Sequence, residues 1–250
     1  MKKAISVLFA VIILSAFLTA CSINLNINMS TEEPAQPATS AAETALSPTE
    51  NPTQPPAKPV IGKLSDYVKT AKENTVSFGD GNTVTLRLPE ILIESADADA
   101  ANLKIMNAYG KAVNGGANYT GVYNLDYEAY LNESVLSVII TAKYNGGNSY
   151  GMALNFDVLT GSGLDNSALC TAANRDLAEV ETKLEAELIK SYDDKWSTLP
   201  GNDSMRAKTL TKDNIKSSEL YLDEKGGMSA LVKTYAAVGG GEFLMQINID

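Results

Sequence analysis

The feature that most constrains the fold is an alternation of apolar and polar residues over 135–161. Two runs place apolar residues at every second position, the period of a half-buried β-strand. If 145–149 form a loop, residue 144 faces 150, 142 faces 152, 140 faces 154 and 138 faces 156, so all apolar side chains share one face. We therefore predict an antiparallel hairpin. Its apolar residues are Leu136, Val138, Ile140, Ala142 and Tyr144, then Tyr150, Met152, Leu154, Phe156 and Val158.

A third strand precedes this hairpin. Apolar residues and glycine occupy odd positions from Tyr119 to Leu131, and Asn124, Asp126 and Glu128 lie between them. This pattern is typical of a strand with one polar face. A loop at 132–135 would pair 131 with 136 and 129 with 138, again apolar with apolar. We predict a three-stranded meander at about 119–131, 136–144 and 150–159.

The remaining segments predict an α+β fold with a mostly antiparallel sheet and two main helices. One helix is expected after Ser95, with one apolar face, and a second after Asp176, reaching about Trp196. Residues 197–217 stay unassigned. The expected apolar faces are Leu103, Met106, Tyr109 and Val113 in the first helix, and Leu177, Val180, Leu184, Leu188 and Tyr192 in the second. The expected outer strands are 75–78 and 83–88 around a turn at 79–82, then 220–222, 229–237 and 243–249.

The first twenty residues have the pattern of a lipoprotein signal peptide. Lys2 and Lys3 precede an apolar run at 4–18, and Leu-Thr-Ala precedes Cys21. The run is shorter than the roughly 20 residues of a membrane span, and a plain secretory signal lacks this cysteine. An uncleaved anchor helix is the alternative. We expect residues 1–20 to be removed and Cys21 to carry acyl chains such as palmitate, anchoring the protein at the extracytoplasmic face of the cell membrane.

The composition changes abruptly after Cys21. Seven of the nine prolines lie between residues 22 and 59, among Thr, Ala, Ser, Glu and Gln. Such a segment buries too little apolar surface to offset its ordering entropy, so we predict a disordered linker over 21–59. Residues 60–250 are enough for one domain with a substantial core.

Charge and the lack of histidine exclude several function classes. The net charge is −10, and loss of Lys2 and Lys3 with the signal peptide makes it about −12. Nucleic acid is therefore a poor partner. Without histidine there is no Ser-His-Asp or Cys-His nucleophile pair and no imidazole zinc site. Carboxylate pairs, lysine bases and oxygen-ligated metals are still allowed. Cys170 is expected to be a buried small hydrophobe rather than a reactive thiol.

The hairpin loop is the candidate ligand site, because it could present backbone amides and small polar groups to a glycan or a protein. The alternative is that its glycines only supply positive φ angles. Tyr130 lies on the polar face of its strand, whereas the other tyrosines are expected in packing or, alternatively, in a sugar platform. The candidate ligand-binding residues are Asn145, Gly146, Gly147, Asn148, Ser149 and Tyr150.

The acidic motifs indicate turns and helix ends more than chemistry. Asp80-Gly81-Asn82 lacks the later glycine and glutamate of a calcium loop, and a turn is the simpler interpretation. The pairs Asp193-Asp194 and Asp223-Glu224 are among several acids available for acid–base chemistry, and nothing in their spacing selects one. We predict no catalytic residues, no cofactor and no metal.

Three stretches carry a resemblance to a known family: YNGG at 144–147, NFDVLTG at 155–161 and the strand pair at 221–249 with its GGG turn. Together they resemble the exported domain of unknown function in RsiV-like lysozyme-sensing anti-sigma factors and ahead of the catalytic domain in some peptidoglycan deacetylases. The resemblance covers about 60–250. Family members commonly carry Ala-His where this chain has Asn148 and Ser149, so any role of that histidine is absent.

The resemblance implies a sensing domain. In contrast to those relatives, we expect this chain to have neither the sigma-binding segment nor a deacetylase domain. We accordingly expect a non-enzymatic binding or sensing module of the cell envelope, with a lysozyme-like protein or a peptidoglycan fragment as its partner. Two alternatives are an enzyme that acts on cell-wall polymers through carboxylates and a structural spacer lipoprotein.

Overall fold

The computed structural model describes residues 59–77, 81, 83–115 and 121–250, which belong to one compact unit, Pro56–Asp250. The predicted signal peptide, Cys21 and nearly all of the linker lie outside these residues, as do most of the 79–82 turn and Tyr119. Within the described part of the chain, no helix combines the length and apolar character that a membrane crossing needs. The same residues contain no cluster of three or more His, Cys, Asp or Glu suited to a metal ion.

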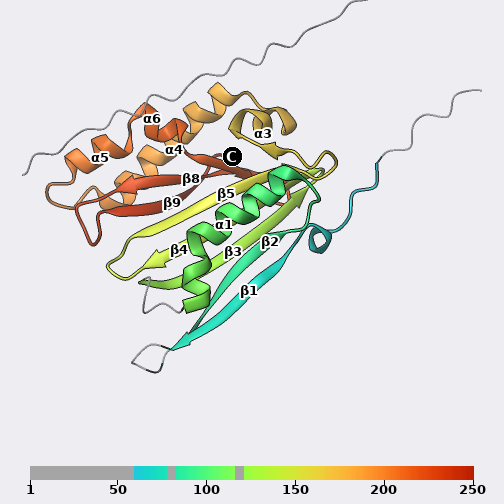
Figure 1. The fold of residues 1–250 in the computed structure, drawn as a ribbon. Coiled ribbons are helices and arrows are strands. Elements are labelled where there is room, and N and C mark those ends of the chain that lie inside the picture. Colours follow the sequence, from blue (N-terminus) through green and yellow to red (C-terminus); the bar gives the residue numbers. More distant parts are fainter. Residues whose placement is uncertain (1–58, 78–80, 82, 116–120) are drawn as a thin grey trace, which may run out of the picture. The chain divides into compact units, whose positions relative to one another are not determined.

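The predicted meander forms the middle of the unit (Figure 1). Leu131 faces Leu136 and Ala129 faces Val138, so the predicted register of the first strand pair is confirmed. We call this antiparallel sheet the central sheet. Its strands, in spatial order, are β3 (Val122–Asn132), β4 (Val135–Tyr144), β5 (Ser149–Asp157) and the short β6 (Gly163–Leu164).

The hairpin of β4 and β5 forms in a register two residues away from the predicted one. Lys143 pairs with Ser149, so the prediction that Tyr144 faces Tyr150 is wrong. A shift of two residues leaves each side chain on its own face, so the apolar pattern fits both registers equally. The loop fixes the outcome: the N–H of Tyr144 donates to the carbonyl of Asn148 (2.9 Å). The two loop glycines have φ angles of 95° and 96°, which glycine adopts without strain.

A bulge near the start of β3 changes which residues are buried. The register shifts between Val122 and Asn124, so Tyr123 is the extra residue. Val122 is consequently 1% exposed, although the predicted alternation placed the odd positions on the buried face from Tyr119 onward. After the bulge the alternation is as predicted, and Leu125 is fully buried.

An N-terminal hairpin lies next to β3, on the side away from β4, and a helix packs against this hairpin. The strands are longer than predicted, and the helix begins after Ser95, whose Oγ accepts the N–H of Ala98 (3.1 Å). The prediction that Leu103 is buried is wrong, since it is 63% exposed. Small residues of α1 face the core instead, and they allow the helix to pack close to the strands beneath it. The elements are β1 (Val68–Ser77), β2 (Thr83–Ile91) and α1 (Ala96–Gly115), and the small residues of α1 are Ala98, Ala101, Gly110 and Ala112.

The last predicted strands form a second antiparallel sheet, the C-terminal sheet. Asp176 caps the helix that covers it, because its side chain accepts the N–H of Glu179 (2.9 Å), as the sequence predicts. The predicted buried side of that helix is confirmed at Val180, Leu184 and Leu188. The strands are β7 (Glu219–Leu222), β8 (Met228–Tyr235) and β9 (Glu242–Asn248), and the helices are α3 (Asn166–Ala172), α4 (Leu177–Trp196), α5 (Asp203–Thr209) and α6 (Lys212–Lys216).

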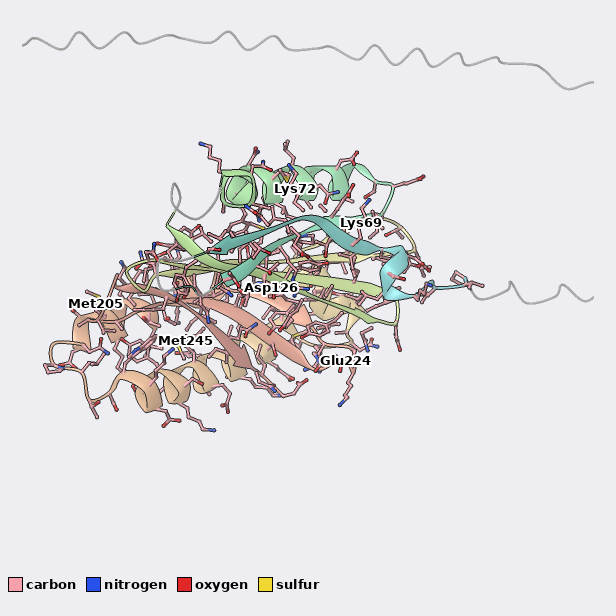
Figure 2. The ribbon with its side chains drawn as sticks, turned by 90° about the horizontal axis from the view of Figure 1, so that it is seen from below. Lys69, Lys72, Asp126, Met205, Glu224 and Met245 are labelled. Atoms are coloured by element: carbon pink, nitrogen blue, oxygen red, sulfur yellow. The ribbon has the colours of Figure 1, made fainter. Side chains whose placement is uncertain are left out.

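The elements stack in layers, and Figure 2 shows α1 on one side and α4 to α6 on the other, with the sheets between them. One apolar cluster joins α1 to the β1–β2 hairpin and the central sheet, and a second joins α3 and α4 to the C-terminal sheet. A third and smaller cluster, built on Ile139, Ala153, Tyr221 and Leu231, lies between the two sheets. The fold is therefore α+β with mostly antiparallel sheets, as predicted.

Polar side chains also connect the two sheets. The Ser137 hydroxyl donates to Asn155 Oδ1 (2.7 Å) and accepts the N–H of Leu222 (3.1 Å). Asn155 Nδ2 donates to the carbonyl of Leu220 (2.8 Å). Both side chains are buried, so these bonds satisfy groups that water cannot reach. We call this set of hydrogen bonds the seam.

Candidate functional site

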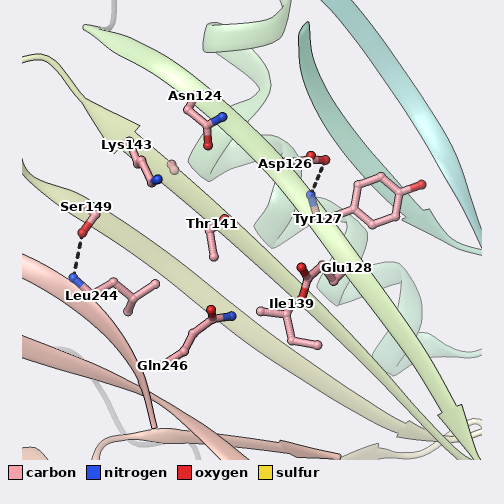
Figure 3. Close-up of a pocket in the computed structure, with 11 residues that line it drawn as sticks. Asn124, Asp126, Tyr127, Glu128, Ile139, Thr141, Lys143, Ser149, Leu244 and Gln246 are labelled. Carbon is pink, nitrogen blue, oxygen red and sulfur yellow. Dashed lines mark hydrogen bonds between the residues drawn. The ribbon is translucent and has the colours of Figure 1, made fainter. Parts of the chain in front are cut away.

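A groove of about 340 Å³ opens between the central sheet and β9 (Figure 3). Its polar side chains come from β3, β4, β5 and β9, and apolar side chains lie among them. Clefts that combine a few convergent polar groups with apolar surface are the usual form of a binding site. The lining residues are Asn124, Asp126, Tyr127, Glu128, Ile139, Thr141, Ala142, Lys143, Ser149, Leu244 and Gln246.

Strand alternation places the polar side chains in this groove. On β3, residues 124, 126 and 128 lie opposite the buried odd positions, and on β4 Ile139, Thr141 and Lys143 lie opposite the buried even ones. On β9, Met245 and Ile247 pack against the helices, so residues 244 and 246 turn toward the central sheet. The groove therefore forms where the non-core faces of two sheets meet.

One carboxylate of the groove is already paired. Asp126 accepts from Arg87 of β2 through both oxygens, from Nε and Nη2 at 2.8 Å each. Its Oδ1 also accepts the N–H of Tyr127 (2.8 Å). The hydrogen bonds with Asp126 raise the pKa of Arg87 above its ordinary value. This geometry holds the Asp126 carboxylate in place and occupies both of its oxygens with donors. A carboxylate held in this way is poorly placed to transfer protons to or from a substrate.

The second carboxylate accepts a hydrogen bond from a tyrosine. The Tyr130 hydroxyl donates to Glu128 Oε2 (2.8 Å). Burial, and then this hydrogen bond, raise the pKa of Tyr130 to about 12. Tyr130 packs against the cluster between the sheets, so the polar-face tyrosine noted in the sequence is a packing residue with a polar tip. Glu128 has no ion pair among the described residues.

Ser149 separates the groove from a second pocket of about 350 Å³. Its Oγ accepts the N–H of Leu244 (2.8 Å), which links β5 to β9 (Figure 3). Ser149 and Leu244 line both spaces. The second pocket also contains Tyr150, Gly151, Ser217, Glu219, Leu231, Lys233 and Phe243.

Glu219 is the carboxyl group in this second pocket. It accepts the N–H of Ala153 (2.6 Å) on the open edge of β5, and Lys104 lies 4.0 Å away. Burial raises the pKa of Glu219, and the backbone hydrogen bond opposes that shift. No second carboxylate lines this pocket among the described residues. Glu219 therefore closes a strand edge rather than forming half of an acid–base pair.

The structure distributes the predicted loop residues among different roles. Asn145, Gly146 and Gly147 are exposed and line neither the groove nor the second pocket. Asn148 packs against the 239–241 turn, where a Cβ on residue 240 would lie 1.4 Å from Asn148 Oδ1. Of the six candidates, Ser149 lines both spaces and Tyr150 lines the second one.

One acid of each pair singled out in the sequence has a structural partner. Asp193 pairs with Arg206 at 2.6 and 2.8 Å, and hydrogen bonding to that guanidinium lowers the pKa of Asp193. Asp223 accepts N–H groups of its own turn, at residues 225 and 227. Cys170 is 1% exposed and its burial raises its pKa, which confirms the expectation of a buried small hydrophobe.

Comparison with known proteins gives little further information. No protein-family model matches the chain, and no curated protein matches it. Among solved structures, the chain is similar to a member of the DUF3298 family from Bacteroides fragilis NCTC 9343. The sequence identity is 13%, the TM-score is 0.33, and the alignment covers 72% of this chain and 88% of that chain.

Proposed function

We propose that residues 60–250 form a non-enzymatic binding module of the cell envelope, held at the extracytoplasmic membrane surface by acyl chains on Cys21, and that its ligand occupies the groove. The observation that supports this most directly is the state of the two groove carboxylates. Asp126 is fully occupied by Arg87, so only Glu128, which accepts one hydrogen bond from the Tyr130 hydroxyl, is still available in the groove. A glycosidase-type mechanism needs one of two such acids to carry a proton and the other to be available.

The lining favours recognition of a small polar ligand. Asn124, Thr141 and Gln246 offer amide and hydroxyl groups beside the apolar surface of Leu244. Cell-wall fragments have alternating polar and apolar surfaces of this kind. A lysozyme-like cationic protein is the alternative ligand, because the net charge of the chain is −10.

The test is calorimetric titration of the full chain in detergent with soluble peptidoglycan fragments and with hen-type lysozyme, at low and high salt. A groove-filling variant, Thr141→Tyr, is compared with Thr75→Tyr, which changes the same residue type at an exposed strand position of β1. We expect saturable binding of wall fragments that Thr141→Tyr reduces at least tenfold and Thr75→Tyr leaves unchanged. Equal binding by both variants would place the ligand elsewhere. Hydrolysis of the fragments would contradict the non-enzymatic assignment.

A further inference from the structure

The charges of the groove point to the chemical class of its ligand. Two of its charged side chains lack an ionic partner among the described residues. The Lys143 ammonium group makes neither a hydrogen bond nor an ion pair there, and the Glu128 carboxylate has only the neutral Tyr130 hydroxyl. Arg87 and Asp126 neutralise each other. The groove therefore presents one cation and one anion that a ligand can pair.

These two charges lie at opposite ends of the groove (Figure 3). In the strand register, Lys143 is opposite Asn124 and Glu128 is opposite Ile139. The two positions are thus four residues apart along the sheet, which corresponds to about 13 Å at the usual rise of an antiparallel strand.

The groups between the two charges suit an extended backbone. Thr141 and Gln246 face each other across the groove from β4 and β9, and each offers both a donor and an acceptor (Figure 3). Leu244 provides an apolar contact beside them. A peptide backbone has donors and acceptors at every residue and side chains that alternate in direction.

We propose that the groove binds a short peptide with free termini, extended along β4, with its carboxylate at Lys143 and its ammonium group at Glu128. A span of about 13 Å corresponds to roughly four extended residues. Such a zwitterion carries no net charge, so the acidic protein does not repel it as it would an anion. This inference rests on the proposed function, because it assigns a ligand class to the same groove.

The test titrates the full chain in detergent with four tetra-alanine peptides: free, N-acetylated, C-amidated and doubly capped. We expect the free peptide to bind, and each cap to weaken binding about tenfold or more, because each removes a charge-assisted contact. Dialanine spans only about 7 Å and cannot reach both charges, so it should bind at least tenfold more weakly than the tetrapeptide.

Variants assign each end of the ligand. Lys143→Met should weaken binding of the free peptide, because it removes the cation that pairs with the peptide carboxylate. It should leave binding of the C-amidated peptide unchanged, since that peptide has no carboxylate to pair with Lys143. Glu128→Gln should show the same pattern with the N-acetylated peptide. Lys111→Met, at an exposed position of α1, is the matched control and should bind all four peptides like the parent chain.

Three outcomes would overturn the inference. If the doubly capped peptide binds as tightly as the free one, the terminal charges play no part. If chitotetraose binds in a Thr141→Tyr-sensitive manner and no peptide does, the groove is a saccharide site, and the proposed function survives without this ligand class. If peptides, saccharides, wall fragments and lysozyme all fail to bind, the inference and the proposed function both fall.

Discussion

Gly151 of β5 packs against β4 of its own sheet and against Leu244 of β9. A Cβ at this position would lie 2.6 Å from the carbonyl oxygen of Ile140 and 2.6 Å from Cδ2 of Leu244. The first contact is with backbone, which cannot rotate away. Glycine is therefore required at this position by close packing against β4 and β9, and it does not mark a break in the strand.

We predict that Gly151→Ala lowers the free energy of unfolding by about 1–3 kcal/mol, the usual cost of overpacking. Gly115→Ala is the control, because a Cβ there meets nothing within 4 Å. That substitution should change stability by less than about 0.5 kcal/mol. Urea denaturation of both variants measures the difference, and equal stabilities would mean that the sheets pack less closely over residue 151.

Tyr109 of α1 gives the fold a pH dependence in the alkaline range. It is 5% exposed, and its burial raises its pKa to about 12. Between an unfolded pKa of about 10 and the folded value, the native state retains a proton that the unfolded chain has lost. Stability must therefore fall as the pH rises through this interval.

We expect the free energy of unfolding to decrease from about pH 9 to about pH 12, with at most about 3 kcal/mol due to Tyr109. Tyr109→Phe should have a shallower pH dependence, since it has no proton to lose at this position. Urea denaturation at several pH values tests this expectation. Identical slopes in the two proteins would show that residue 109 is not the responsible group.

Among the elements, β2 and β3 are neighbours that belong to different sheets. Side chains connect the N-terminal hairpin to β3: Arg87 of β2 binds Asp126, and the hydroxyls of Thr70 of β1 and Tyr127 lie 2.8 Å apart. The guanidinium also lies over the Tyr127 ring, 5.7 Å from its centroid. The N-terminal hairpin is thus held to the central sheet by side-chain contacts and by the shared apolar cluster.

A double-mutant cycle with Arg87→Ala and Asp126→Ala should give a coupling of about 0.5–1 kcal/mol that decreases with added salt. The value is modest because both side chains are about 40% exposed. The Lys69–Glu90 pair within the hairpin, which is single and exposed, should give less than about 0.5 kcal/mol. A coupling energy near zero between Arg87 and Asp126 would mean that their bidentate ion pair adds nothing to stability.

The elements also show what the sequence can predict. Strict alternation identified β3, β4, β5 and β9, and capping residues identified both long helices. The two-residue shift of the β4–β5 hairpin was not predictable, because the apolar pattern is the same in either register. The helices α3, α5 and α6 are too short for their periodicity to be distinguished from loop sequence.

The groove could be predicted only in parts. The polar residues of β3 were visible as alternation and indicated a strand with one polar face, whereas β9 was expected only as an outer strand. Their meeting depends on how the C-terminal sheet crosses the central one. No local pattern records that crossing, which is set by contacts such as Ser149 with Leu244 and Asn155 with Leu220.

At the scale of the whole molecule, the seam is the main polar link between the central sheet and the C-terminal sheet, each of which has its own apolar core. We predict that Asn155→Ala lowers the free energy of unfolding by about 2–3 kcal/mol, because it leaves the buried Ser137 hydroxyl without an acceptor and the Leu220 carbonyl without a donor. Asn145→Ala, in the exposed loop, should be nearly neutral. Chemical denaturation measures both changes, and a neutral Asn155→Ala would indicate that water replaces the amide.

The separation of the two main apolar clusters has a consequence for cooperativity. A unit with two cores joined by a small third cluster is expected to open in stages, with amides of one half exchanging with solvent before global unfolding. A ligand in the groove touches β3 and β4 on one side and β9 on the other, so it would be released by any opening that separates the sheets. Saturating ligand should therefore slow hydrogen exchange in β7 to β9 as well as in the central sheet, and the two halves should then unfold as one cooperative unit.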